Sequence, residues 1–311
     1  MNDIDYPPAP SRFCREERFV RLLLHIMNTI HHFMKLEFVR LLRFLNVYKL
    51  TRYHRDETIR DRDYYTVIEY PKCGRTWLRY MLNQALAIKT GVPLMNIMHD
   101  VPYRKSILRL PYIYYVHGMD PEKSIEGCHY QKLFKNELCP FGFILLVRKP
   151  ENVMKSYYYQ ILYRQSNVSF RGDLSDFIRS ENFGIKKYVD YVDFYLKALA
   201  RKNCLVVRYE DMAADTCHGL REILNFIKMP IDDEQIASIV ANSTADKMRE
   251  VEEKDFYKVG WLRTRDANNP QSRKVRSCGG ESVEEMFSPD DLRYMREVYE
   301  KNKSFQLLGY V

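Results

Sequence analysis

The segment YYTVIEYPKCGRTWL, Tyr64 to Leu78, is the most informative fifteen-residue stretch of this 311-residue chain. It begins with a run of β-branched and aromatic residues, passes through a turn that contains Pro71 and Gly74, and ends in a helical pattern. This order predicts a strand that leads into a loop at the N-terminus of a helix. Such loops bind phosphate groups, because backbone N–H groups and the helix dipole both favour an anion there.

The loop itself carries further donors. We expect the backbone N–H groups from Cys73 to Trp77 to point at one spot, with the charge of Lys72 and the hydroxyl of Thr76 beside it. The loop is not a Walker A motif, because its lysine precedes Gly74 and no Gly-Lys-Ser or Gly-Lys-Thr ends it. An ordinary Mg-ATP site is therefore disfavoured. The simpler alternative is a strand-to-helix turn with an incidental lysine.

A second segment, FGFILLVRKPENVMKSYYYQ from Phe141, makes that alternative weaker. Its continuous apolar run is typical of a strand buried on both faces, and Pro150 opens the helix that follows. Arg148 then lies at the carboxyl end of the strand, where parallel α/β sheets bind ligands, and Ser156 lies two turns into the helix. A guanidinium with a hydroxyl nearby suits a phosphate. The alternative here is a surface salt bridge and a solvated serine.

Together these residues resemble the cytosolic-type sulfotransferases, which use 3'-phosphoadenosine 5'-phosphosulfate (PAPS). The family's Tyr-Pro-Lys-Ser-Gly-Thr-Thr-Trp loop, which cradles the 5'-phosphosulfate, is similar to Tyr70–Trp77 here. Its Arg-Asn-Pro segment, whose arginine and a later serine hold the 3'-phosphate, is similar to Arg148–Pro150 with Ser156 at the same spacing. The resemblance implies that Lys72, Cys73, Gly74, Arg75, Thr76, Trp77, Arg148 and Ser156 bind the nucleotide.

The resemblance extends along most of residues 60 to 300 and implies further site residues. The segment YIYYVHG looks like the strand that ends in the family's catalytic histidine, which would make His117 the general base. The segment LVVRYEDM looks like the family's strand whose tyrosine lies near the adenine, here Tyr209. The segment NSTADKM is similar to a stretch that closes over the base, with Ser243 and Thr244 as candidate contacts. The segment RKVRSCGG looks like the basic loop that clamps the 3'-phosphate, with Arg273, Lys274 and Arg276 as candidates. The sequence leaves open whether Arg273 or Arg276 is the phosphate ligand.

Four departures from the family pattern stand out. Cys73 replaces a serine, and its backbone N–H is expected to serve equally well. Arg75 replaces a threonine, which adds a charge that either grips the phosphosulfate or faces the acceptor. Tyr115 stands where many members have a lysine, so no lysine assists His117 from that position. Val275 and Cys278 interrupt the Arg-Lys-Gly of the basic loop.

The implied chemistry is in-line transfer of a sulfuryl group from PAPS to an acceptor hydroxyl. By analogy with phosphoryl transfer, Lys72 would neutralise the leaving oxygen and His117 would take the proton of the attacking hydroxyl. The protein's contribution is mainly positioning and electrostatic stabilisation. We expect no metal, because no paired carboxylates and no Cys/His cluster in the sequence offer one a site.

The order of elements predicts an α/β fold, a three-layer P-loop-like architecture with a mostly parallel central sheet flanked by helices. The expected strands, each followed by polar or helical sequence, are Tyr64–Tyr70, Tyr112–His117, Phe143–Val147 and Leu205–Tyr209. We expect this domain to occupy residues 56–311. Residues 1–55 form a basic amphipathic helical extension in this prediction.

The extension has two apolar repeats of helical period, one from Phe19 to Phe33 and one from Phe38 to Tyr48. It holds ten Lys and Arg against five Asp and Glu, so it supplies five of the chain's eight excess positive charges. Residues 12–50 are thus candidates for peripheral contact with an anionic membrane or for binding a partner. Packing on the protein's own domain is the more common fate of such helices.

Charge and cysteine usage give weaker indications. The basic balance suits a cofactor with several phosphates, and no nucleic-acid-binding module is apparent. The seven cysteines show no paired spacing, which favours reduced thiols and a cytoplasmic location. The longest near-apolar stretch, Leu22 to Met34, is too short for a membrane span, so a type II Golgi anchor is not expected. Oligomeric state is not predicted.

The function predicted from the sequence is therefore a PAPS-dependent sulfotransferase that acts on a hydroxyl of a carbohydrate or lipid-linked acceptor ahead of a small phenol. The alternative from another class is a nucleotide-binding membrane or interaction module without turnover, which the altered basic loop and Tyr115 would favour. A P-loop kinase is a third possibility, and it suffers from the missing Walker lysine.

Overall fold

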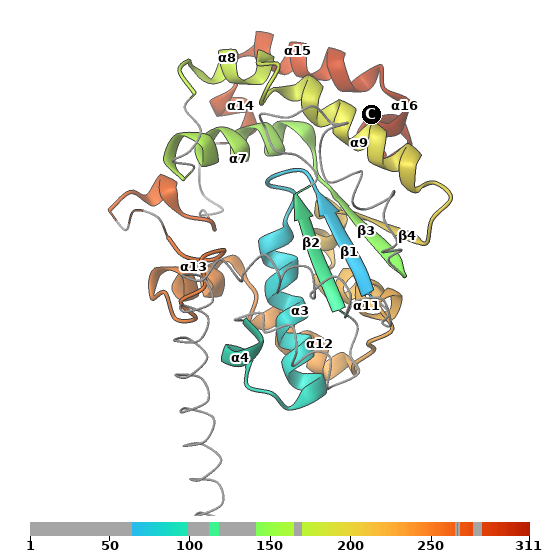
Figure 1. Cartoon of the computed structure of the whole chain (residues 1–311). Helices are drawn as coiled ribbons and strands as arrows, with labels where there is room; N and C mark the ends of the chain where they lie inside the picture. The colour runs from blue at the N-terminus through green and yellow to red at the C-terminus, as the bar shows by residue number, and fades with distance from the viewer. Residues whose placement is uncertain are drawn as a thin grey trace, which may run out of the picture. The chain divides into compact units, whose positions relative to one another are not determined.

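The central feature of the computed structural model is a four-stranded sheet in which all strands run parallel (Figure 1). The structure describes residues 64–98, 112–117, 141–164, 170–264, 266, 268–275 and 282–311. The strand order is β2-β1-β3-β4, with bounds β1 Tyr64–Glu69, β2 Tyr112–His117, β3 Gly142–Val147 and β4 Cys204–Arg208. The α/β prediction is confirmed. The N-terminal helices predicted before residue 50 lie outside the described residues.

Sequence and burial agree in the two central strands. All six residues of β1 and all six of β3 are buried, as expected for strands covered on both faces. The outer strand β4 is only half-buried, except for the exposed Val206. The predicted strands Tyr64–Tyr70 and Leu205–Tyr209 each run one residue too far. Tyr70 already belongs to the loop, and Tyr209 begins a helix.

The helices form two groups around the sheet (Figure 1). In one group α3, α11 and α12 pack together, and in the other α7, α8, α9, α15 and α16 do so. A smaller apolar cluster that includes Tyr80 and Met248 joins α13 to α3. Within the described residues, the helices and the 3-10 turn η2 run as follows: α3 Arg75–Thr90, α4 Leu94–Met98, α7 Pro150–Tyr163, α8 Leu174–Arg179, α9 Ile185–Leu199, α10 Tyr209–Ala214, α11 Thr216–Phe226, α12 Asp233–Ala241, α13 Ala245–Glu253, η2 Pro270–Ser272, α14 Val283–Met286, α15 Pro289–Glu300 and α16 Lys303–Leu307.

Tyrosines anchor the chain where β1 ends. Tyr70 is 2% exposed, and its ring packs against Tyr157, Tyr188 and Tyr191 with centroids 5.0 to 5.6 Å apart. Its hydroxyl donates to the carbonyl oxygen of Phe183 at 3.3 Å. This packing fixes the start of the loop that follows, so the loop residues have a rigid base.

Candidate functional site

The loop between β1 and α3 has an unusual backbone. Lys72 has φ +78° and Gly74 has φ +107°, both in the left-handed region. A lysine seldom adopts that conformation, and residues held in it cluster at functional sites. Gly74 is required here for a second reason, since a Cβ at this position would lie 2.8 Å from Cδ2 of Tyr209. Lys72 therefore lies in a tight turn, and the ring of Tyr209 packs against this turn at Gly74.

The backbone N–H groups of the loop do not all converge as predicted. The Cys73 N–H donates to the carbonyl oxygen of Tyr70 at 3.3 Å, and the Arg75 N–H donates to Oε2 of Glu69 at 3.0 Å. Cys73 is also buried, with its thiol 3.9 Å from the hydroxyl of Tyr188, and burial raises its pKa. The Cys73 N–H is thus already used by a turn within the loop, and its expected contact with the phosphate stays a prediction.

Glu69 is one of the pocket-lining residues that the sequence did not predict. It is the last residue of β1 and is 2% exposed. Its carboxylate accepts a hydrogen bond from the backbone N–H of Arg75 and pairs with the side-chain Nε of Arg75 at 3.1 Å. Burial raises the pKa of this carboxyl, while the positive charges of Arg75, Lys274 and Lys72 lower it in part. The one available signal was its position, a carboxylate at the end of an otherwise apolar strand and six residues before Arg75.

Arg148 lies at the carboxyl end of β3, as predicted. Its Nη1 donates to the carbonyl oxygen of Lys72 at 3.1 Å, and its guanidinium lies over the ring of Tyr209 at 4.2 Å from the centroid. Its Nε is buried and has no hydrogen-bond partner within the described part of the chain. The hydroxyl of Tyr188 holds its backbone, donating to the Arg148 carbonyl at 2.6 Å and accepting from its N–H at 3.0 Å.

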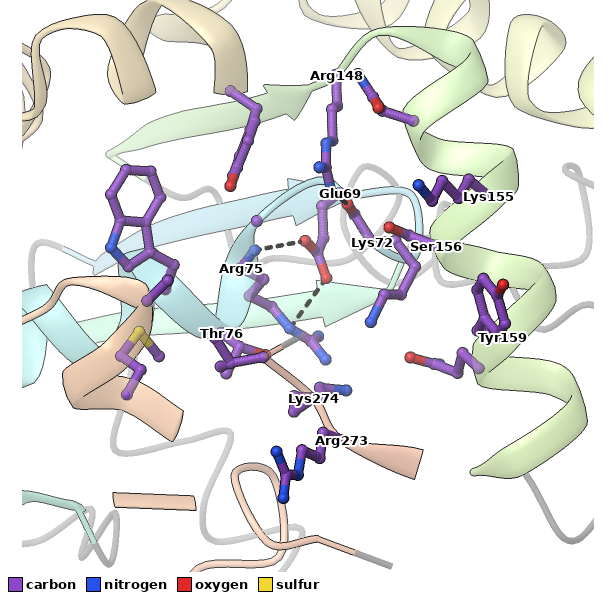
Figure 2. Close-up of a pocket in the computed structure, with 18 of the residues that line it drawn as sticks. Glu69, Lys72, Arg75, Thr76, Arg148, Lys155, Ser156, Tyr159, Arg273 and Lys274 are labelled. Atoms are coloured by element: carbon purple, nitrogen blue, oxygen red, sulfur yellow. Dashed lines mark hydrogen bonds and ion pairs between the residues drawn. The ribbon is translucent and has the colours of Figure 1, made fainter. Parts of the chain in front are cut away.

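Helix α7 supplies the wall opposite the loop. Ser156 is buried, and Figure 2 shows Lys155, Ser156 and Tyr159 projecting from α7 toward the space beside Lys72. The sequence indicated Ser156 but not its neighbours. Residues at i and i+3 or i+4 share a helix face, so the helical spacing was the signal for Tyr159.

An aromatic region lies beside Gly74. The rings of Trp77 and Tyr209 are 5.6 Å apart, and Trp77 Nε1 donates to the carbonyl oxygen of Ser243 at 2.9 Å. The Ser243 hydroxyl accepts from Gln84 Nε2 at 2.7 Å, and the hydroxyl of Thr244 caps α13. Ser243 therefore ties its segment to α3, and both serine and threonine hydroxyls have partners in the protein.

The basic loop is held by one buried carboxylate, Glu252 of α13. Its oxygens accept the backbone N–H groups of Lys274 and Val275, the Thr264 hydroxyl at 3.1 Å, and Nη1 of Arg164 at 3.3 Å. Burial, followed by the positive charges of Arg164 and Arg75, lowers the pKa of Lys274 to about 8. An amine in this setting is poised to gain an anionic partner.

Arg273 makes a different contact. Its Nη2 pairs with Oε1 of Glu253 at 2.9 Å, while Arg276 lies outside the described residues. Which of the two arginines contacts a 3'-phosphate therefore stays open.

These segments enclose one pocket of about 780 Å³. Its walls contain twelve of the residues predicted from the sequence: Lys72, Gly74, Arg75, Thr76, Trp77, Arg148, Ser156, Tyr209, Ser243, Thr244, Arg273 and Lys274. Its wall also contains Glu69, Asn152, Lys155, Tyr159, Gln160, Met248 and Gln271, which were not predicted. Segments that are far apart in the sequence, from residue 69 to residue 283, thus line the same pocket.

His117 is described by its backbone alone. It ends β2 as the register partner of Glu69, so it lies at the same end of the sheet as the loop. Its role as a base stays a prediction. Tyr115, two residues earlier, has its ring 5.1 Å below the guanidinium of Arg79.

Two features are absent from the described residues. No group of three His, Cys, Asp or Glu side chains is arranged to hold a metal ion among them. Nor does any helix within the described ranges combine the length and apolar character needed to cross a bilayer. The predictions about metal and membrane contact stay untested.

Residues 63–308 match the family model described as the sulfotransferase domain. Among curated proteins, sulfotransferase 6B1 of Danio rerio is 24% identical over 209 residues, which cover 62% of this chain and 66% of that protein. Sulfotransferase 2B1 of Homo sapiens is 28% identical over 204 residues, covering 62% of this chain and 53% of that one. The matches thus span about half to two thirds of these relatives' length.

Solved structures have the same fold. Mouse sulfotransferase SULT7A1 complexed with PAP is 17% identical with a TM-score of 0.51, and the match covers 78% of this chain and 84% of that one. Retinol dehydratase in complex with androsterone and the inactive cofactor PAP is 13% identical with a TM-score of 0.52, covering 77% and 80%. At these identities the likeness establishes the fold.

Proposed function

The chain belongs to the sulfotransferase family, and we propose that it transfers the sulfuryl group of PAPS to an acceptor hydroxyl, with a carbohydrate or lipid-linked acceptor ahead of a small phenol. The observation that carries the proposal is the meeting of two anion-binding groups in one pocket. Lys72 and Thr76 come from the β1–α3 loop, while Arg148 and Ser156 come from β3 and α7. A nucleotide with phosphate at both its 5' and 3' positions needs two such places.

The residues present fit this nucleotide. The buried Nε of Arg148 still has a donor to offer, since no described residue accepts from it. The close approach of Tyr209 to Gly74, with Trp77 alongside, makes a flat aromatic region suited to a purine. Lys72, Thr76 and the start of α3 would hold the 5' end, and Arg148 and Ser156 the 3'-phosphate. Pocket-lining cations outnumber the carboxylate of Glu69, which favours an anionic ligand.

Each residue then has a defined task. PAPS, when bound, supplies an activated sulfuryl group on a good leaving group. Lys72 would place its ammonium against the oxygen that gains negative charge, and His117 would accept the proton of the acceptor hydroxyl. The PAP present in two solved structures of the same fold supports the choice of nucleotide. Retinol and androsterone in such structures support a hydroxyl-bearing acceptor.

The test is a transfer assay with PAPS and a panel of sugars, sterols and phenols, following the formation of adenosine 3',5'-bisphosphate (PAP). We expect His117→Ala to abolish turnover while PAP binding is kept, and Arg148→Ala to weaken PAP binding. Undiminished turnover in His117→Ala would remove the proposed base. Tight PAP binding without transfer to any acceptor would instead favour a non-catalytic nucleotide-binding module.

The division into an extension, 1–55, and a catalytic domain, 56–311, stays part of the proposal, as does a cytoplasmic protein with peripheral membrane contact through residues 12–50. Flotation with anionic and neutral vesicles tests that contact. Selective flotation of the full chain with anionic vesicles would support it.

A further inference from the structure

A buried carboxylate stands inside a pocket that otherwise favours anions. Glu69 is 2% exposed and lines the same pocket as Lys72 and Lys274. Such a carboxylate opposes the binding of phosphate and is costly to bury unless it is paired. Arg75 compensates it at two points, because the backbone N–H and the Nε of Arg75 both donate to the carboxylate. The two residues therefore form one unit.

This pairing fixes where Arg75 points. Its Nε side faces Glu69 at 3.1 Å, so the outer Nη edge of the planar guanidinium is turned away from the carboxylate. Figure 2 shows that edge directed into the pocket near Lys274, whose pKa is lowered in part by the charge of Arg75. Arg75 is therefore held as a charged, oriented donor in the pocket wall.

The pairing with Glu69 also changes which hydrogen-bond donors the β1–α3 loop can present to a ligand. The first backbone N–H of α3, which would normally serve a bound phosphate, is used by Glu69. The side chain of Arg75 extends several bonds farther from the helix than that N–H does. The guanidinium of Arg75, and not its N–H, is therefore the group that this residue presents to the pocket.

We propose that Glu69 is a positioning residue that holds Arg75 against the sulfuryl end of the nucleotide, so that the pair selects the sulfated nucleotide over the unsulfated one. The inference rests on the proposed function for the identity of the nucleotide. Planar guanidinium groups make paired, charge-assisted bonds to oxyanions, which suits a terminal sulfuryl group.

The experiment measures the dissociation constants of PAPS and PAP for the full chain by calorimetry, and compares their ratio among variants. Arg75→Gln should weaken PAPS by about tenfold relative to PAP, since one charge-assisted contact is lost. Glu69→Gln should also weaken the binding of PAPS relative to PAP, by about fivefold, because the amide no longer orients the guanidinium. Glu69→Asp, which keeps the charge but shortens the side chain, should behave like Glu69→Gln.

The double variant Glu69→Gln/Arg75→Gln distinguishes positioning from an independent role. If Glu69 acts through Arg75, the double variant loses no more PAPS preference than Arg75→Gln alone. The control is Arg221→Gln, which removes an arginine from an exposed ion pair with Asp233 and should leave both affinities unchanged. Circular dichroism of each variant checks the fold.

Three outcomes would overturn the inference. A ratio unchanged in Glu69→Gln and Glu69→Asp would show that Glu69 does not position Arg75. Equally tighter binding of PAPS and PAP by the Glu69 variants would show instead that the carboxylate opposes the binding of both nucleotides. Binding of both nucleotides by the wild type without any transfer counts against the proposed function alone, and the ratio still tests the pair. Binding of neither nucleotide overturns both.

Discussion

The backbone N–H of Lys274 donates to Oε1 of Glu252, and this contact joins the basic loop to helix α13. Glu252 is 1% exposed, and it also neutralises Arg164, whose side chain is 7% exposed. Arg164 in turn donates to the carbonyl oxygens of Ser272 and Arg263. The loop that brings Lys274 to the pocket therefore depends on a buried ion pair.

Glu252→Gln should destabilise the protein by about 3 to 5 kcal/mol, because it leaves the guanidinium of Arg164 buried without its carboxylate. Urea unfolding measures this, and PAP affinity should fall with it. The neighbouring Glu253→Gln is a matched control, since Glu253 is half exposed and its pair with Arg273 is worth about 0 to 1 kcal/mol. Equal effects of the two variants would contradict a special role for Glu252.

The lowered pKa of Lys274 predicts a pH dependence of nucleotide binding. The free protein loses the charge of Lys274 as the pH rises through about 8, so PAP affinity should fall about tenfold between pH 7 and pH 9. The Lys274→Met variant should bind PAP weakly at both pH 7 and pH 9. The Lys274→Arg variant should keep its PAP affinity across this range. A wild-type profile that is flat to pH 9 would show that this amine does not contact the ligand.

The charge of Lys274, which is expected to favour nucleotide binding, should lower the stability of the nucleotide-free protein. Because its pKa is lower in the folded protein than the ordinary value of 10.5, the charged amine destabilises the fold below about pH 8, and this cost disappears as the pH rises. Lys274→Met should thus raise the melting temperature of the nucleotide-free protein at pH 7. The comparison at pH 9.5 should show a smaller difference.

Gly74→Ala should lower stability by about 1 to 3 kcal/mol and abolish PAP binding. Both the backbone, at φ +107°, and the contact with Tyr209 oppose a side chain there. Gly91→Ala is the control, because Gly91 has φ +65° but no atom within 4 Å of the added Cβ. It should cost about 1 kcal/mol and leave PAP affinity unchanged. Thermal unfolding and calorimetry measure the two effects.

Tyr188→Phe should lower the free energy of unfolding by about 1 to 3 kcal/mol and reduce PAP affinity. The substitution removes the hydrogen-bond partner of both the N–H and the carbonyl of Arg148. Tyr163→Phe, which removes a hydroxyl from an exposed side chain on α7, should change neither quantity. Unchanged PAP affinity in Tyr188→Phe would mean that Arg148 needs no such support.

Local pattern was sufficient for much of the fold. The buried strands β1 and β3 have continuous apolar runs, and Gly74 and Pro150 mark the starts of α3 and α7, so these elements follow from the chain itself. The placement of Lys72 and Arg148 at the carboxyl ends of neighbouring strands follows as well. Both kinds of signal are short-range, because strand and helix periods are written in consecutive residues.

The pairing of side chains was decided only by the tertiary structure. The sequence suggested Lys72, Thr76, Arg148 and Ser156 as candidate phosphate ligands. It did not indicate that Glu69 accepts the N–H of Arg75 or that Glu252 holds the loop of Lys274. A buried carboxylate is stable only where a donor from elsewhere in the fold reaches it. Which donor does so depends on distances across the assembled sheet and helices, and those distances are not encoded by spacing along the chain.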